Sequence, residues 1–389
     1  MKEFIRVFVV CLFLTAWQVI YGKEIPRIAY MGPVVDNVSL KEYSDIKACG
    51  FTHCINIYNS LSLAKSDLAR AYKSGVGLYI HTPQIVQTPA QAVAYLKGQS
   101  GLSGYFLADE PSYSDLNLIR KRIDVIRKLD SNHVCCVNLH PYYDANQFKS
   151  IGSPTYQQYL EAASDLNLPQ LSFDYYPVTK DGLRDGWFGN LRLVRNLCLK
   201  KKIVFWGFVL TVPHGIYPEP TLAALRLQAY VNLAYGAKAL VYFTYKNPTD
   251  KTYDFHDAPI NADGKKTKTY YLVKTLNDEL KTVSSLFFNA KITRIGHLVK
   301  VPNGERKAVC PKQLDSLVVS GKKGALVSEF LCGKNLYVAV INKDLESSMR
   351  LNLKAKTRGV CYINKKLQQK KLVGSYIIQP GDMVLFKLK

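Results

Sequence analysis

The chain has 389 residues, of which 48% are hydrophobic and 21% are charged, and its formal net charge is +22. This length supplies a sizeable core, which excludes a small domain held together mainly by disulfides, and it predicts two domains or one large barrel with an appendage. The positive charge favours acidic partners, namely nucleic acid, anionic lipid or an acidic polysaccharide, although its diffuse spread fits a charged, soluble surface equally well.

The first 22 residues are typical of a signal peptide. Lys2 and Arg6 give a basic start, and Val7–Ile20 is an almost uninterrupted apolar run. Because that run is short and Lys23 follows it closely, removal after export is favoured over a retained anchor, and no later stretch is long and apolar enough to span a membrane. We therefore expect an exported protein, in the periplasm, at the cell surface or secreted, which argues against nucleic acid as its partner.

Eight cysteines follow this segment, and none forms a CxxC pair, so a zinc ribbon is not indicated. Their even number permits disulfides in an oxidising compartment, and several lie in apolar runs where a free thiol packs as a small hydrophobe. These cysteines are Cys49, Cys54, Cys135, Cys136, Cys198, Cys310, Cys332 and Cys361.

One pattern repeats eight times along residues 23–288: a short apolar run, a loop and a helical stretch. Such alternation predicts parallel strands with crossover helices, and eight units match a (β/α)8 TIM barrel of roughly 250 residues. The apolar runs begin near Arg27, His53, Gly77, Gly104, Val134, Leu171, Ile203 and Leu240. The fourth helical stretch, DLNLIRKRIDVIRKL, is expected to face the core with Leu118, Ile119, Val125, Ile126 and Leu129.

Residues 289–389 lack helical stripes. Short runs with period-two alternation, such as NLYVAVIN and MVLFKLK, are separated by Gly, Asn and Asp residues. They predict a small antiparallel β-sandwich domain after the barrel. No constellation of catalytic residue types stands out in this part, so we expect it to serve packing or surface binding.

The stretch GYFLADEP, residues 104–111, ends a buried strand in two adjacent carboxylates and a proline. Glycoside cleavage needs an acid that protonates the leaving oxygen and a second carboxylate across the sugar. We interpret Glu110 as that acid. Asp174 is the preferred base or nucleophile because it ends a barrel strand among aromatic neighbours, and Asp257 is the other candidate. This hydrolysis requires no cofactor.

The carboxyl ends of the strands carry polar and aromatic side chains, and in a barrel of this type these ends meet on one rim. Aromatic faces with polar edges suit a sugar ring, which has an apolar C–H face and a belt of hydroxyls. We therefore expect a carbohydrate substrate, neutral or acidic. Its polar contacts are predicted to come from Asp109, Asn138, His140, Tyr176 and His81.

Trp206 and Tyr245 are the candidate platforms on which a sugar ring stacks, with ordinary core packing as the alternative for Trp206. Trp187 and Phe188, in the stretch DGWFGN, are expected at a loop edge of the same cleft.

GYFLADEP resembles the strand-4 signature of the clan A (β/α)8 glycoside hydrolases, which is commonly Asn-Glu-Pro and whose glutamate is the acid/base. The stretch LRLQAYVNLAYGAKALVYFTY resembles the helix 7 to helix 8 region of the β-galactosidase-type barrels, and YVAVINKD and PGDMVLFKL resemble their small C-terminal β domain. The resemblance implies a glycosidase in which Glu110 is the acid/base. It also implies that Asp109 takes the position of the asparagine that contacts the sugar 2-hydroxyl.

The chain departs from this family at one important position. Clan A places its nucleophilic glutamate at the end of strand 7, and IVFWGFVLTVPHG holds no carboxylate. Glu219 follows, but YPEPT is typical of the acidic first turn of a helix. Inversion through an activated water, assistance by a group of the substrate, and a carbohydrate-binding barrel without activity all stay open.

A different class of function uses the same rim. His81, Glu110, His140 and Asp174 are residue types that bind zinc or manganese, so a metal-dependent barrel enzyme is the alternative. No paired motif such as HxH supports it, and we predict no metal in the site.

Overall fold

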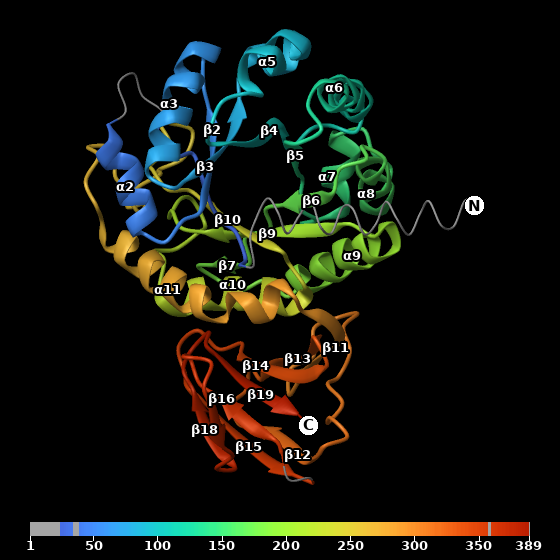
Figure 1. Ribbon diagram of the computed structural model, residues 1–389. Helices are drawn as coiled ribbons and strands as arrows, with labels where there is room; N and C mark the ends of the chain where they lie inside the picture. Colours follow the sequence, from blue (N-terminus) through green and yellow to red (C-terminus); the bar gives the residue numbers. More distant parts are fainter. Residues whose placement is uncertain (1–23, 34–38, 357–358, 389) are drawn as a thin grey trace.

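The computed structural model describes residues 24–33, 39–356 and 359–388, and Figure 1 shows its two parts. A barrel of strands ringed by helices forms one part, and an antiparallel β domain forms the other. The predicted signal peptide, residues 1–22, lies outside the described residues.

Eight parallel strands close the barrel, which confirms the prediction from the eight apolar runs. Neighbours in the ring follow the chain order, and β1 pairs with the last strand, β10, to close it. The strands are β1 (Arg27–Tyr30), β2 (His53–Ile57), β3 (Gly77–His81), β4 (Leu102–Asp109), β5 (Val134–Leu139), β6 (Gln170–Phe173), β9 (Val204–Leu210) and β10 (Ala239–Phe243).

A helix follows each strand and covers the outside of the barrel. These helices are α2 (Leu40–Ala48), α3 (Leu61–Lys73), α5 (Pro89–Leu96), α6 (Asp115–Leu129), α8 (Tyr156–Ser164), α9 (Gly186–Lys201), α10 (Leu222–Tyr235) and α11 (Lys268–Phe288). Three small elements lie in the loops between strands and helices: α4 (Pro83–Gln87), α7 (Ala145–Ser150) and the hairpin of β7 (Val178–Thr179) and β8 (Gly182–Leu183).

The predicted core face of α6 is partly wrong. Of the five residues expected in the core, Leu118, Val125 and Leu129 are exposed. The buried positions are spaced three and four residues apart, as one face of a helix requires. They are Leu116, Ile119, Ile123 and Ile126.

The prediction that Trp187 and Phe188 form a loop edge is wrong. Both side chains are fully buried in the first turn of α9. Phe188 packs edge-on against His297 of the following domain, with ring centroids 4.8 Å apart. These rings therefore belong to the contact between the barrel and the β domain.

Two antiparallel sheets form the β domain, as the period-two alternation predicts. Their inner faces enclose a separate core, which includes Val338, Leu351 and Phe386. The larger sheet has the order β11 (Lys291–Leu298), β13 (Ala325–Cys332), β14 (Asn335–Asn342), β19 (Met383–Leu388), β16 (Cys361–Ile363) and β17 (Gln369–Lys371). The smaller sheet has the order β12 (Leu314–Val319), β15 (Met349–Ala355) and β18 (Ser375–Ile378).

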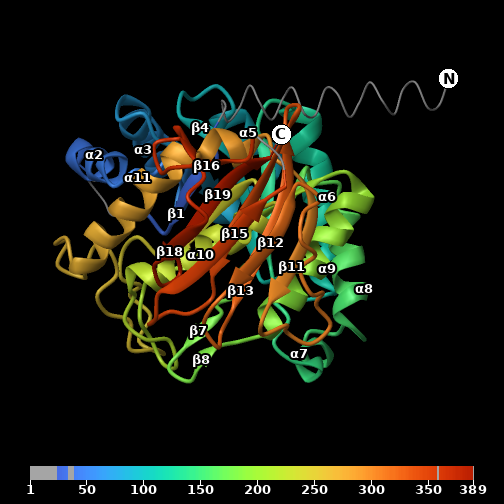
Figure 2. The same cartoon turned by 90° about the horizontal axis from the view of Figure 1, so that it is seen from below.

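The β domain packs against the outer helices of the barrel, below α10 and α11 in Figure 1. Seen from below, its strands cross the barrel beneath α10 (Figure 2). Ser328 Oγ donates to the Ala234 carbonyl at 2.8 Å, and Phe287 packs against Phe330 with ring centroids 5.1 Å apart. Hydrogen bonds and apolar packing thus join the two parts.

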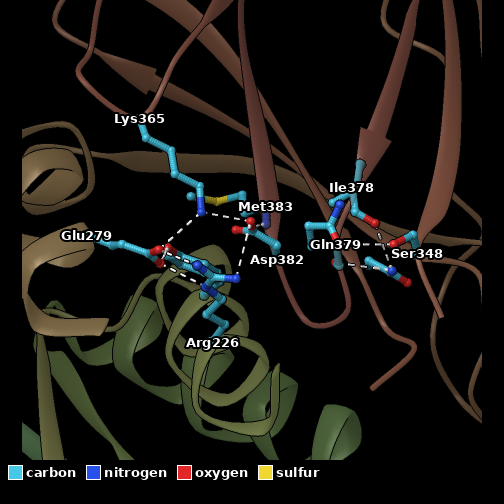
Figure 3. A network of polar contacts seen from close by, with 10 residues as sticks. Arg226, Glu279, Ser348, Lys365, Ile378, Gln379, Asp382 and Met383 are labelled. Carbon is cyan, nitrogen blue, oxygen red and sulfur yellow. Dashed lines mark hydrogen bonds and ion pairs between the residues drawn. The ribbon is translucent and has the colours of Figure 1, made fainter. Parts of the chain in front are cut away.

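A polar network crosses the same contact (Figure 3). Arg226 of α10 holds both carboxylate oxygens of Glu279 on α11, with Nε 2.9 Å from Oε2. Its Nη1 lies 3.7 Å from Asp382 in the β domain. Lys365 Nζ completes the network, 3.2 Å from Glu279 and 2.8 Å from Asp382. Two cations and two carboxylates therefore pair across the domain contact.

Gly381 marks a point where the β domain touches α10 directly. Its φ is +65°, and a Cβ there would lie 2.0 Å from the Ala223 carbonyl oxygen. We expect Gly381→Ala to lower the free energy of unfolding by about 2 kcal/mol or more, measured by urea unfolding. Gly321→Ala is the control, because Gly321 also has a positive φ of +93° but nothing within 4 Å. Equal losses in the two variants would contradict the contact.

The eight cysteines from Cys49 to Cys361 are all free thiols, and five of them are buried. Burial raises the pKa of Cys135 to about 12, so this thiol stays protonated at neutral pH.

Among the helices that the structure describes, none is long and apolar enough to cross a membrane.

Candidate functional site

Glu110 directly follows β4 and has an unusual backbone conformation. Its φ of +46° lies in the left-handed region, which residues other than glycine rarely adopt, and its N–H donates to the Asn138 carbonyl at 2.9 Å. The side chain is 40% exposed, and Oε1 lies 3.5 Å from His140 Nδ1. Strained conformations of this kind cluster at functional sites, where the surrounding structure must hold them.

Asp109, the last residue of β4, is held by two side chains. Tyr30 Oη donates to Oδ2 at 2.7 Å, and Asn138 Nδ2 donates to Oδ1 at 2.9 Å. Ser172 fixes the amide of Asn138 in turn, because its Oγ donates to Asn138 Oδ1 at 3.1 Å. Asp109 is exposed at the surface of the site. The surrounding protein nevertheless removes part of the water around its carboxyl group, which raises the pKa of Asp109, and repulsion from the charge of Glu110 raises it further.

Asp174 directly follows β6 and is the most strongly perturbed carboxyl of the group. Tyr176 Oη donates to Oδ2 at 3.3 Å, whereas Oδ1 is buried and has no hydrogen-bond partner among the described residues. Burial raises the pKa of Asp174 well above its ordinary value, and the charges of Glu110 and Asp109 raise it further. The ends of β4 and β6 therefore bring three carboxyl groups into mutual electrostatic contact.

This environment predicts that Asp174 reduces stability at neutral pH. Because its folded-state pKa lies above the unfolded value, ionisation opposes folding, and this penalty disappears as the pH falls toward the unfolded-state pKa. We expect Asp174→Asn to raise the free energy of unfolding at pH 7, with a gain that shrinks toward pH 4. Urea unfolding of both proteins across that range measures it. Asp181→Asn, at an exposed position, is the control, and a gain that grows with acidification would contradict the prediction.

Among the described residues, β9 and the loop that follows it hold no carboxylate before Glu219. Thr211, the next residue, is buried and donates from Oγ1 to the Thr244 carbonyl at 2.8 Å. Glu219 pairs with His256 Nε2 at 2.9 Å, and both side chains are exposed. Asp257, the other candidate, is an exposed residue of the loop after β10. Of the candidates for the second carboxylate, Asp174 is therefore the one whose pKa the charge of Glu110 raises.

The contacts of three other predicted site residues are with groups other than these carboxyls. His81 Nδ1 is bonded to the Phe106 carbonyl at 2.9 Å. Trp206 is 1% exposed and packs edge-on against Tyr79 in the barrel core, with ring centroids 5.5 Å apart. Tyr245 is 3% exposed and packs against Phe51. Neither ring presents a face to solvent, so burial corrects their expected role as sugar platforms.

The structure adds Tyr143, Tyr175 and Tyr217 to the predicted Tyr176, and we call these four side chains the tyrosine wall. Tyr143 packs against Tyr175 with centroids 4.7 Å apart, and Tyr176 meets Tyr217 edge-on at 5.6 Å. The wall comes from the loops after β5, β6 and β9, all at the carboxyl ends of the strands. Tyrosines recurring in these loops were the available sequence signal for this group.

The metal-dependent alternative finds no support in this geometry. Within the described ranges, no group of three or more His, Cys, Asp or Glu side chains has an arrangement that could hold a metal ion. One ring nitrogen of His81, Nδ1, is already engaged by the Phe106 carbonyl.

No protein-family model matches the sequence, and no curated protein matches it. Solved structures, in contrast, are similar in fold. A β-galactosidase from Bacillus circulans sp. alkalophilus aligns over 94% of this chain and 99% of its own, with a TM-score of 0.63 and 9% identity. Eubacterium rectale Amy13B aligns over 94% and 96%, with a TM-score of 0.55 and 8% identity.

A β-galactosidase from the psychrophilic Marinomonas ef1 aligns over 67% of this chain, with a TM-score of 0.53 and 9% identity. The present chain spans 60% of that protein's length. At such identities the similarity concerns the fold, and in the first two of these proteins it extends over 94% of this chain. The chain therefore has a (β/α)8 barrel fold similar to that of these two β-galactosidases, followed by an antiparallel β domain.

Proposed function

We propose that this protein hydrolyses a glycosidic bond of an oligosaccharide or polysaccharide, with Glu110 as the general acid. The observation that carries the proposal is the carboxyl cluster at the ends of β4 and β6, in which Glu110 is strained, half-exposed and beside His140. The fold shared with the two β-galactosidases and the tyrosine wall beside the cluster agree with a carbohydrate substrate. Export to the periplasm, cell surface or medium is proposed from the N-terminal sequence alone.

The proposed reaction needs a proton on Glu110 and a negative charge on Asp174. Repulsion from Glu110 is one cause of the raised pKa of Asp174. When Glu110 carries the proton, this repulsion disappears, and Asp174 ionises more readily. The form with Glu110 protonated and Asp174 ionised is therefore the reactive one: Glu110 donates to the leaving oxygen, and Asp174 acts as base or nucleophile.

The remaining side chains of the cluster would orient the sugar. Tyr30 and Asn138 each donate to one carboxylate oxygen of Asp109. Each of these oxygens has a second lone pair, which can accept from a sugar hydroxyl. His140 and Tyr176 stand beside the two reacting carboxyls and supply further polar contacts. No cofactor takes part in this scheme.

A screen of oligosaccharides tests the proposal. The purified protein is incubated with neutral and acidic oligosaccharides, and new reducing ends are detected by mass spectrometry, with a parallel series in EDTA. Shorter products that form in EDTA support a metal-independent glycosidase. Loss in EDTA with recovery on adding metal would contradict it.

A carbohydrate-binding barrel without activity is the second candidate, and the missing carboxylate at the end of β9 favours it. Saturable binding of oligosaccharides, measured by calorimetry, without any cleavage in the same screen would support this candidate and overturn hydrolysis.

A further inference from the structure

Arg184 directly follows the β7–β8 hairpin, in the loop after β6, and stacks on the tyrosine wall. Its guanidinium carbon lies 4.8 Å from the centroid of the Tyr143 ring and 5.8 Å from that of Tyr217. Its backbone N–H donates to the Pro177 carbonyl at 2.8 Å, which anchors the residue. Two aromatic faces and a backbone bond thus hold a partly buried cation in place.

The guanidinium has no anionic partner in the described part of the chain. Asp185, its neighbour, pairs instead with Lys300, with 2.8 Å between Nζ and Oδ2. Asp144, beside Tyr143, caps α7 by accepting from the N–H groups of Asn146 and Gln147. An arginine stacked on aromatic rings can still donate hydrogen bonds from the edge of its guanidinium to a planar anion. Because Asp185 and Asp144 have other partners, neither occupies this edge in Arg184.

A short chain of contacts joins Arg184 to the carboxyl cluster. Tyr143 Oη accepts from the Tyr176 N–H at 3.2 Å and lies 3.4 Å from Tyr217 Oη. Tyr176 Oη in turn donates to Asp174 at 3.3 Å. Tyr143 and Tyr176 thus link the guanidinium to Asp174. Figure 2 shows the β7–β8 hairpin and α7 at the same end of the barrel.

We propose that Arg184 binds an anionic substituent, a carboxylate or a sulfate, on a sugar next to the bond that is cleaved. The substrate is therefore an acidic oligosaccharide, which agrees with the net charge of +22. Tyr143, 37% exposed, offers part of its ring to the same sugar. The inference rests on the proposed function and deepens it, because it assigns the substrate class to a single side chain.

Binding in the Glu110→Gln background tests the inference without cleavage. Calorimetry is run with oligomers of polygalacturonate, alginate and chondroitin sulfate, each compared with its carboxyl-reduced form, and the last also with its desulfated form. Arg184→Gln is expected to weaken binding of the charged form by about 10- to 100-fold and to leave the neutral form unchanged. If the difference between wild type and Arg184→Gln disappears on carboxyl reduction, Arg184 binds a carboxylate. If it disappears on desulfation, Arg184 binds a sulfate.

Two further variants complete the design. Arg184→Lys keeps the charge but not the two-pronged geometry, so an intermediate loss is expected. Arg350→Gln removes an equal charge from an exposed position on β15 and corrects for non-specific attraction of polyanions. Thermal unfolding checks that each variant is folded.

Several outcomes would overturn the inference: equal binding of charged and neutral forms, an equal loss in Arg184→Gln and Arg350→Gln, or no binding of any charged oligomer. Failure of the proposed function is recognised separately. If the wild-type protein binds charged oligomers through Arg184 but cleaves none, only hydrolysis fails. If it cleaves neutral oligosaccharides and Arg184→Gln changes nothing, only the inference fails.

Discussion

Glu110→Gln is expected to lower kcat/KM by about 10²- to 10⁴-fold for sugars whose leaving group is another sugar. Glutamine keeps the size of the side chain but has no proton to give, and a sugar alkoxide leaves poorly without one. The loss should be much smaller for a dinitrophenyl glycoside of the same sugar, because this phenolate leaves without protonation. Rates are measured at several pH values on both substrates, and thermal unfolding verifies the fold.

Glu346→Gln, at an exposed position of the β domain, is the matched control and should retain full activity. Equal losses on both substrates in Glu110→Gln would show that Glu110 does not protonate the leaving group. A fully active Glu110→Gln protein would exclude it from the reaction altogether.

Arg226→Met is expected to lower the free energy of unfolding by about 3 kcal/mol at pH 7. The guanidinium is 14% exposed and binds Glu279 through two nitrogens, with Asp382 nearby (Figure 3). Methionine keeps much of the apolar stem but leaves two partly buried carboxylates with Lys365 as their remaining cation. Urea unfolding followed by circular dichroism measures the change.

The effect of Arg226→Met should depend on pH. Although burial opposes ionisation, Arg226 and Lys365 more than offset it, so the pKa of Glu279 is lowered. Stability from this group is present above the unfolded-state pKa and is lost as the pH falls through the lower, folded-state pKa. The difference between wild type and variant should therefore shrink in acid. Arg350→Met is the control, and a difference that is independent of pH would contradict the ionic role.

Local sequence patterns predicted the fold because each unit of the barrel repeats the same pattern of an apolar run, a loop and a helical stretch. Eight apolar runs, separated by helical stretches, are enough to place eight parallel strands and their helices, and period-two alternation distinguishes the β domain. Chain order also predicted part of the candidate site. Glu110, His140 and Asp174 follow β4, β5 and β6, which are neighbours in the ring, so their positions at strand ends place them on one rim.

Finer features of the fold were beyond local patterns. The buried face of α6 keeps Ile119 and Ile126 but has Leu116 and Ile123 in place of the other predicted residues, because apolar side chains occur on both faces of that helix. Trp206 is apolar, aromatic and close to a strand end, which fits a sugar platform as well as a core residue. The packing of Tyr79 against Trp206 in the structure shows that Trp206 is a core residue.

The sequence by itself determined the barrel, the β domain and the strand ends that carry the carboxyl groups. Other features follow from the tertiary structure alone. Tyr30 donates to Asp109, which is 79 residues away in the sequence, and the surrounding protein desolvates Asp174. Arg184 stacks on Tyr143 and Tyr217. The physical reason is that periodicity reports which face of an element is apolar. Burial, pKa and the partner of a charge depend instead on side chains that distant parts of the chain bring together.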